Sequence, residues 1–154
     1  MSTTTLQCES IDILNQQFAD AIDLRHQAMQ ARWGAKRSNC LSLSRTFDQV
    51  GHHIERFIDL IAERVLDLGG VSIESIQTAA EGSRLPAYPR EIMLGLHHAR
   101  ALSIALAIFA LRIRSRSDVA RSYGDVITAS LLTHAWRGLE PVIWRVDSLV
   151  HAEG

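Results

Sequence analysis

The chain has 154 residues, of which 47% are hydrophobic and 21% charged, and its net charge at neutral pH is −1. This length is enough for one domain with a sizeable core, and the composition is that of an ordinary globular protein. A charge so close to zero gives no electrostatic argument for binding to nucleic acid. Lys36 is the only lysine, so we do not expect lysine-rich tails that hold DNA.

The first residues and the cysteines indicate the cellular compartment of the protein. Residues 1–10 are rich in Ser and Thr and lack the basic and apolar segments of a secretory signal. Cys8 and Cys40 have the spacing of neither a zinc motif nor a redox pair. We therefore expect a reduced, cytoplasmic chain with no membrane partner, in which residues 1–9 form a short disordered tail and residues 10–151 a single domain.

Apolar residues recur along most of the chain with the helical period of about 3.6 residues. The first helix is expected from about Ser10 to Trp33. The second helix follows a short polar turn, with Ser38 as its N-terminal cap, and it ends at Gly69-Gly70.

A longer connection separates the second helix from the third. Because it is too long for a simple turn, we expect a short extra helix at 72–76. The third helix is expected at about 90–114 as a buried helix. A tight turn at 115–118 leads to the last helix, which ends near Val150 and contains a bend at Pro141. Four long helices with one long crossover that carries a short extra helix describe an all-α, ferritin-like four-helix bundle.

Carboxylates lie on one face of the second helix. Asp59 and Glu63 are four residues apart, and Asp48 precedes Asp59 by eleven residues, close to three helical turns. The same helix carries a continuous apolar face, so such a row is costly unless a cation neutralises it. A metal ion and an arginine side chain are both candidates for that cation.

Several short motifs follow one another in a characteristic order. They are Gln30-Ala31-x-Trp33, Asp59-x-x-x-Glu63-Arg64 with Leu68-Gly69-Gly70, Tyr88-Pro89, Asp125-x-x-Thr128 and Arg137-x-Leu139-Glu140. On these motifs the sequence resembles the Dps mini-ferritins, the DNA-protection-during-starvation proteins, over about residues 14–150. The resemblance implies a hollow dodecameric shell that oxidises and stores iron in protection against oxidative stress. It also implies a cytoplasmic location and leaves association with the nucleoid open.

The resemblance further implies where iron is oxidised. In such shells the sites lie between two-fold-related subunits, and one subunit supplies the carboxylates at the positions of Asp59 and Glu63. The other supplies two histidines and an aspartate, at the positions of Arg32, Ser44 and Asp48. We call these five residues the ferroxidase positions. All three carboxylates are present, whereas both histidines are replaced.

The replacement has two interpretations. In the first, Arg32 places a permanent cation where a neutral nitrogen ligand would stand. Its guanidinium suits a pair with Asp59 or Glu63 across the subunit interface. The oxidation site would then be inactive, and the chain would form a structural or metal-sequestering shell.

The second interpretation is a metal site displaced along the helix. His52 lies four residues after Asp48, and Glu55 lies four residues before Asp59. Asp48, His52, Glu55, Asp59 and Glu63 then form one row that can bind iron or zinc. The alternative is that this row binds no metal and is a solvated helix face that lines a water-filled interior.

Two further acidic residues, Asp118 and Asp125, lie near the expected turn into the last helix. They resemble the acidic entrances through which iron enters shells of this family. Helix capping and compensation of the helix dipole explain them equally well.

Overall fold

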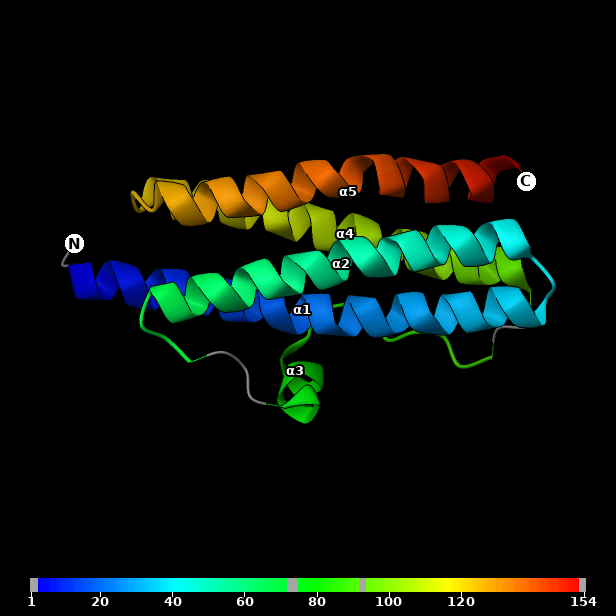
Figure 1. Cartoon of the computed structure of the whole chain (residues 1–154), viewed down its shortest axis with the longest axis horizontal. Coiled ribbons are helices and arrows are strands. Elements are labelled where there is room, and N and C mark those ends of the chain that lie inside the picture. Colours follow the sequence, from blue (N-terminus) through cyan, green and yellow to red (C-terminus); the bar gives the residue numbers. More distant parts are fainter. Residues whose placement is uncertain (1–2, 72–74, 92–93, 153–154) are drawn as a thin grey trace.

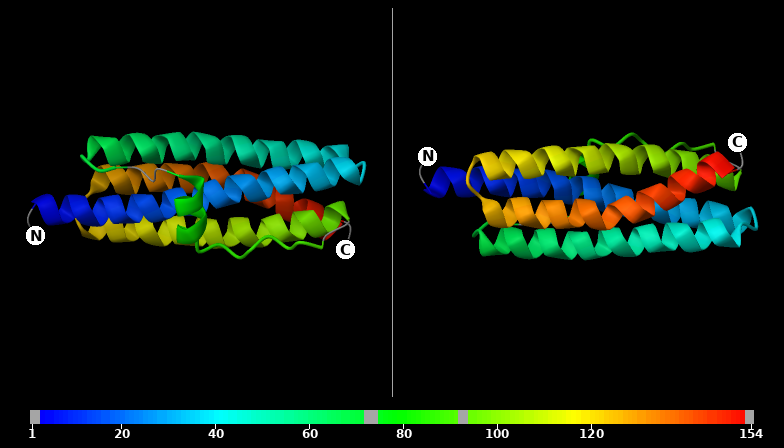
Figure 2. Two further views of the ribbon diagram at one scale, coloured as in Figure 1. Left: turned by 90° about the horizontal axis from the view of Figure 1, so that it is seen from below. Right: turned by 90° about the horizontal axis from the view of Figure 1, so that it is seen from above.

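Four long helices run side by side in the computed structural model, which describes residues 3–71, 75–91 and 94–152 (Figure 1). They are α1 (Thr3–Arg37), α2 (Leu41–Asp67), α4 (Gly95–Ser122) and α5 (Val126–Ala152). α1 packs against α2 and α4, and α5 packs against the same two helices. Each helix is antiparallel to both of its neighbours (Figure 2). The predicted all-α four-helix bundle is therefore confirmed, and no strand occurs in the described residues.

The core lies between the four helices and consists largely of Leu, Ile, Val, Phe and Ala side chains. Phe57 of α2 and Phe109 of α4 meet edge to face, with ring centroids 5.8 Å apart. Phe47, Ile54 and Ile61 of α2 follow the helical period and are fully buried. Burying one such side chain is worth about 1.5–3 kcal/mol, so this stripe turns the opposite, polar face of α2 outward.

The first helix begins earlier than the sequence predicts. α1 starts at Thr3 rather than near Ser10, so residues 3–9, for which the sequence predicts a disordered tail, are helical. No Gly or Pro interrupts this segment, and Ser10, Ile13 and the residues that follow are anchored in the bundle. Extending an anchored helix is easy, because the costly nucleation step has already been made.

The turn between α1 and α2 also differs from the prediction. Cys40 occupies the N-cap position of α2, and no side chain caps this helix. The hydroxyl of Ser38 instead donates to the carbonyl of Gly34 at 2.9 Å, so Ser38 belongs to the end of α1. The chain reverses at Asn39, whose φ of 59° is a left-handed conformation that Asn adopts more readily than most residues.

The long crossover carries a short helix, α3 (Ile76–Gly82), which packs on α1. Residues 72–74 of the helix expected at 72–76 lie outside the described residues. Ser75 caps α3 by accepting a hydrogen bond from a backbone amide three residues later. The crossover is held on α1 where the backbone amide of Arg84 donates to Asp20 at 2.8 Å.

α4 is long and apolar enough to cross a membrane by length and composition. Its apolar residues, including Leu102, Phe109 and Ile113, are instead buried in the bundle core, as the sequence predicts. The helix lies further along the chain than expected, so residues 115–118, predicted as a turn, are helical. The turn into α5 comes later and uses Gly124, whose φ is 85°.

Pro141 lies inside α5, as predicted. Proline has no backbone N–H and its ring crowds the preceding turn, so it weakens a helix locally. The C-terminal half of α5 changes direction relative to its first half (Figure 2).

Candidate metal site on the face of α1 and α2

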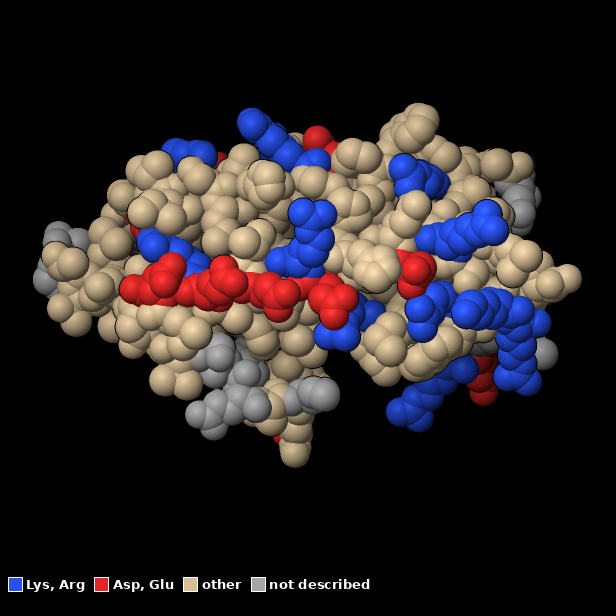
Figure 3. Space-filling model, viewed as in Figure 1, with Lys and Arg blue, Asp and Glu red and all other residues tan. Residues whose placement is uncertain are grey.

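The outward face of α2, together with the adjoining part of α1, carries charges of both signs in separate places. Figure 3 shows acidic side chains in a row over one half of this face and basic side chains over the other half. The exposed residues Glu55, Asp59, Glu63 and Asp67, spaced four residues apart, are called the acidic row here. The basic half comprises Arg25, Arg32, Lys36 and Arg45, from the C-terminal part of α1 and the N-terminal part of α2.

Arg32 forms its ion pair inside the subunit. Its Nη1 lies 2.8 Å from Oδ1 of Asp48, and the two side chains are 31% and 45% exposed. The sequence predicts pairing with Asp59 or Glu63 of another subunit, whereas Asp48 is the partner within this chain. The second oxygen of Asp48 lies 3.5 Å from Nε2 of His52, so the carboxylate is shared between two groups.

A depression of about 200 Å³ lies beside this pair. Its walls come from both helices: Arg25, Met29, Arg32, Asp48, Gly51, His52 and Glu55. Glu55 is itself paired, with Oε1 3.5 Å from Nη2 of Arg25. The depression thus gathers the carboxylates of Asp48 and Glu55 and the imidazole of His52, but two guanidinium groups already neutralise the carboxylates.

The remaining ferroxidase positions do not line this depression. Asp59 and Glu63 lie farther along α2, exposed, and form no ion pair with a described residue. Ser44 is buried one turn before Asp48 and offers only a hydroxyl. Among the described residues, no three His, Cys, Asp or Glu side chains are placed to hold a metal ion. Within the described residues, the ferroxidase positions thus do not gather into one cluster of metal ligands.

Asp125, one of the two predicted entrance residues, is engaged inside the subunit. Its Oδ1 accepts from the backbone amide of Thr128 at 3.0 Å and its Oδ2 from the hydroxyl of Thr128 at 2.6 Å. Nη2 of Arg64 lies 3.1 Å from Oδ1, and the Asp125 side chain is only 4% exposed. These contacts support the capping interpretation for Asp125, and iron entry at this nearly buried carboxylate stays a prediction.

The surroundings of Asp125 favour its charged form. Burial by itself would raise the pKa of this carboxyl, but the nearby Ser10 hydroxyl, the hydrogen bonds from Thr128 and the charge of Arg64 lower it. The net effect is a pKa below the ordinary value. Sequence spacing indicates the cap, but it does not reveal that Arg64 reaches it from α2.

Asp118 behaves differently. It lies near the end of α4 with its side chain 73% exposed and 3.5 Å from Arg121 on the same helix. This surface position is compatible with contact to another subunit or to solvent ions, and iron entry at Asp118 stays a prediction.

A polar cluster that sequence reasoning did not assemble lies where the crossover meets α1 and α4. The Tyr88 hydroxyl contacts Nδ1 of the buried His98, and the two rings stack with centroids 5.9 Å apart. Burial, followed by the charge of His97, lowers the pKa of His98, so its ring is held neutral. A Cβ on Gly34 would lie 2.0 Å from Nε2 of His98, so a glycine is needed there.

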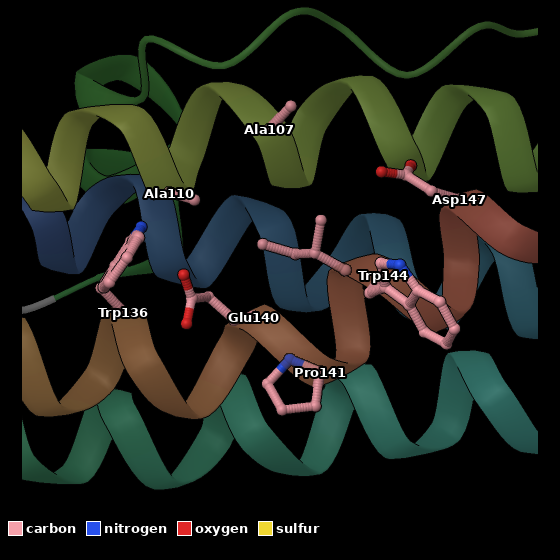
Figure 4. Close-up of a pocket in the computed structure, with 8 residues that line it drawn as sticks. Ala107, Ala110, Trp136, Glu140, Pro141, Trp144 and Asp147 are labelled. Atoms are coloured by element: carbon pink, nitrogen blue, oxygen red, sulfur yellow. The ribbon is translucent and has the colours of Figure 1, made fainter.

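A groove of about 560 Å³ lies between α4 and α5, apart from the ferroxidase positions. Figure 4 shows Trp136 and Trp144 on either side of Glu140 and Pro141. The Trp144 side chain is 74% exposed. The groove is mainly apolar, and none of the ferroxidase positions lines it.

Comparison with known proteins agrees with this architecture. The family model described as a ferritin-like domain matches residues 11–152. The DNA protection during starvation protein of Agrobacterium fabrum is 33% identical over 140 residues, which are 91% of this chain and 86% of that protein. The DNA protection during starvation protein of Brevibacillus brevis is 26% identical and covers 97% of this chain and 99% of its own length.

Solved structures show the same fold. Dps from Thermosynechococcus elongatus superimposes with a TM-score of 0.89 at 18% identity, over 97% of this chain and 95% of that one. DpsC from Streptomyces coelicolor gives a TM-score of 0.88 at 24% identity, over 95% and 86% of the two chains. The family match and the Agrobacterium relative together show that this chain belongs to the Dps family of ferritin-like proteins.

Proposed function

We propose that this chain is the subunit of a hollow, dodecameric shell that binds, oxidises and stores iron and so protects the cytoplasm against oxidative stress. Membership of the Dps family supports the shell and its cargo. The observation that carries the proposal is the outward placement of three carboxylates, Asp48, Asp59 and Glu63, at the ferroxidase positions of α2. Carboxylate oxygens suit iron, and Asp59 and Glu63 have no ionic partner among the described residues.

The site is atypical because Arg32 stands where a histidine ligand is expected. Its guanidinium holds Asp48 at 2.8 Å and carries a permanent charge that repels Fe²⁺. For Asp48 to bind iron, its ion pair with Arg32 must break, for example because Arg32 turns toward another carboxylate. The Arg32 side chain is 31% exposed, so its guanidinium can also donate to a second carboxylate, such as Asp59 or Glu63 of another subunit. We therefore expect iron oxidation here to be slower than at a site with imidazole ligands.

The same ion pair favours a second candidate function, a shell that sequesters metal without ferroxidase activity. In that case Arg32 permanently fills the oxidation site, and the shell keeps its architecture and its acidic surfaces. DNA binding through the chain ends is part of neither proposal.

A metal site displaced along α2, with His52 as a ligand, is a proposal with less support. Such a site requires His52 next to Asp48, and the two are in contact, but Glu55 is already paired with Arg25. If iron or zinc binds there, His52→Ala abolishes tight binding and leaves the assembly intact. Unchanged zinc and iron affinity in this variant would rule the displaced site out.

An anaerobic titration of the assembled protein with Fe²⁺, followed by hydrogen peroxide and measurement of near-ultraviolet ferric absorbance, tests the proposed function. We expect saturable binding and oxidation faster than that of iron in buffer. The double variant Asp59→Asn/Glu63→Gln should lose both, whereas Glu55→Gln/Asp67→Asn, which removes the same charge outside the ferroxidase positions, should keep both. Binding without accelerated oxidation would support the sequestering shell, and absence of saturable binding would contradict both candidates.

A further inference from the structure

A pocket of about 770 Å³ lies where the last turns of α1, the end of the crossover and the start of α4 meet. The crossover, which forms one wall, runs beside α4 on its way to this pocket (Figure 2). None of the described residues that line the pocket is a ferroxidase position. Its volume lies in the range of about 300–1,000 Å³ that holds small ligands in proteins. The pocket therefore has room for a ligand that the proposed function does not use.

Two arginines give this pocket a positive charge. Arg37 of α1 and Arg90 of the crossover line it, and both are exposed. Neither forms an ion pair with a described residue, and no Asp or Glu is among the described residues that line the pocket. A guanidinium carries a permanent charge and donates hydrogen bonds in a fork that fits a carboxylate or a phosphate group. Exposed arginines alone are common on protein surfaces, so the argument for a ligand also depends on the other walls.

The side walls of the pocket are apolar and partly aromatic. They are formed by Trp33, Tyr88, Pro89 and Leu94. Trp33 is 48% exposed, although tryptophan is on average a well-buried residue. A flat ring placed against this indole would remove apolar surface from water and gain an aromatic contact. The walls therefore favour a ligand that carries a flat ring beside its negative charge.

The base of the pocket holds a buried polar side chain. His98 lines the pocket and is 8% exposed, and its Nδ1 contacts the Tyr88 hydroxyl. Burial raises the pKa of this hydroxyl, so it keeps its proton and donates it to Nδ1. The neutral imidazole then carries its own proton on Nε2, which forms no hydrogen bond with a described residue. A buried donor without a partner costs free energy, and a ligand atom that accepts from Nε2 would remove this cost.

We propose that this pocket binds a small organic anion that combines a flat aromatic ring with a carboxylate or phosphate group. The ring lies against Trp33, and the anionic group pairs with Arg37 and Arg90. An acceptor atom of the ligand takes the hydrogen bond from Nε2 of His98. Aromatic carboxylates and nucleoside monophosphates share this chemistry. The inference does not depend on the proposed function, because no ferroxidase position takes part.

Two probes distinguish these two sources of ligand, and each has a matched control. The probes are 2-naphthoate, an aromatic carboxylate, and AMP, a nucleoside monophosphate. 2-Naphthalenemethanol and adenosine lack the negative charge, and decahydro-2-naphthoate lacks the flat ring. Isothermal titration calorimetry of the assembled protein at low salt measures the affinities.

We expect saturable binding of at least one probe, and removal of its charge or of its flat ring should weaken binding about tenfold or more. Tighter binding of AMP would assign the site to nucleoside phosphates, and tighter binding of 2-naphthoate would assign it to aromatic carboxylates.

A charge variant tests the role of the two arginines. Arg37→Gln/Arg90→Gln should weaken binding of the preferred probe about tenfold or more, because the anionic group loses both of its charged partners. The control Lys36→Gln/Arg100→Gln removes the same charge from exposed residues of α1 and α4 that do not line the pocket, and it should bind like the parent.

A second variant tests the aromatic wall. Trp33→Leu should weaken binding of the preferred probe and reduce the discrimination between 2-naphthoate and decahydro-2-naphthoate. Trp144→Leu, which removes an exposed tryptophan from the groove between α4 and α5, should change neither. Circular dichroism confirms that each variant is folded.

Three results would overturn the proposal. The first is the absence of saturable binding of both probes to the parent protein. The second is a parent-like affinity of the folded arginine variant or of the folded Trp33→Leu variant. The third is equal affinity for a probe and its uncharged counterpart. Iron binding and oxidation by the parent are measured separately, so failure of this proposal leaves the proposed function standing, and the reverse also holds.

Discussion

Two Arg–Asp ion pairs, Arg64–Asp125 and Arg32–Asp48, have the same chemistry in different surroundings. The side chains of Arg64 and Asp125 are 14% and 4% exposed, and Thr128 donates two further hydrogen bonds to the carboxylate. Those of Arg32 and Asp48 are 31% and 45% exposed, beside a surface depression. One pair is sealed between helix ends, and the other lies on a face that a second chain or an ion can reach.

This difference indicates different roles. A buried charge cannot lose its partner without a large desolvation cost, so Arg64–Asp125 joins α2 to the start of α5 permanently. A half-exposed ion pair contributes little to the stability of the fold, because water and salt screen the attraction between its charges. Arg32–Asp48 can therefore exchange partners, which a metal site or a subunit contact requires.

The largest effect is expected when the buried pair is broken. Arg64→Ala leaves the Asp125 carboxylate without its cation, and the free energy of unfolding should fall by about 3–5 kcal/mol. Urea denaturation followed by circular dichroism measures the change. Arg121→Ala, which removes one arginine from the exposed pair with Asp118, is the matched control. A loss no larger than that of the control would show that the buried network is not stabilising.

The next effect concerns iron chemistry at the exposed pair. Arg32→His replaces the cation by a neutral nitrogen ligand and releases Asp48, so peroxide-driven iron oxidation should become about tenfold faster, equivalent to ~1.4 kcal/mol in the barrier. Stopped-flow ferric absorbance measures the rate. Arg25→His makes the same change at the neighbouring Arg25–Glu55 pair and should have little effect. Equal rates in the two variants would argue against a role of Arg32 in the site.

The pH dependence of stability should report on the buried pair. The pKa of Asp125 is lowered in the folded protein, so its charged form contributes stability above the ordinary value of 3.8. That contribution is lost as pH falls through the lowered value. Asp125→Asn should therefore be less stable than the parent at neutral pH, and the difference should shrink in acid. A difference that is constant between pH 7 and pH 3 would contradict this assignment.

The smallest effect is expected from removing the exposed pair. Arg32→Ala should change the free energy of unfolding by about 1 kcal/mol or less, because both side chains are partly in water. The change should decrease further in high salt. A loss comparable with that of Arg64→Ala, measured in the same denaturation experiment, would mean that the two pairs are equivalent.

Much of the architecture was predictable because it depends on local patterns. Phe47, Ile54 and Ile61 recur with the helical period, and this alone predicts both the helix and its buried side. The boundaries were less predictable. Residues 115–118 look like a turn, yet they continue α4, because packing of its apolar side chains in the bundle extends the helix beyond its polar end.

For the candidate site, the sequence by itself determined which residues are available: three carboxylates, a histidine, and an arginine where an imidazole is expected. It could not determine that Arg32 pairs with Asp48 or that Arg64 reaches Asp125, since the partners of each pair belong to different elements: α1 and α2 in the first pair, and α2 and the residue before α5 in the second. Spacing along one helix sets which side chains share a face. The distance between side chains on two helices depends on how the helices pack, and only the tertiary structure decides it.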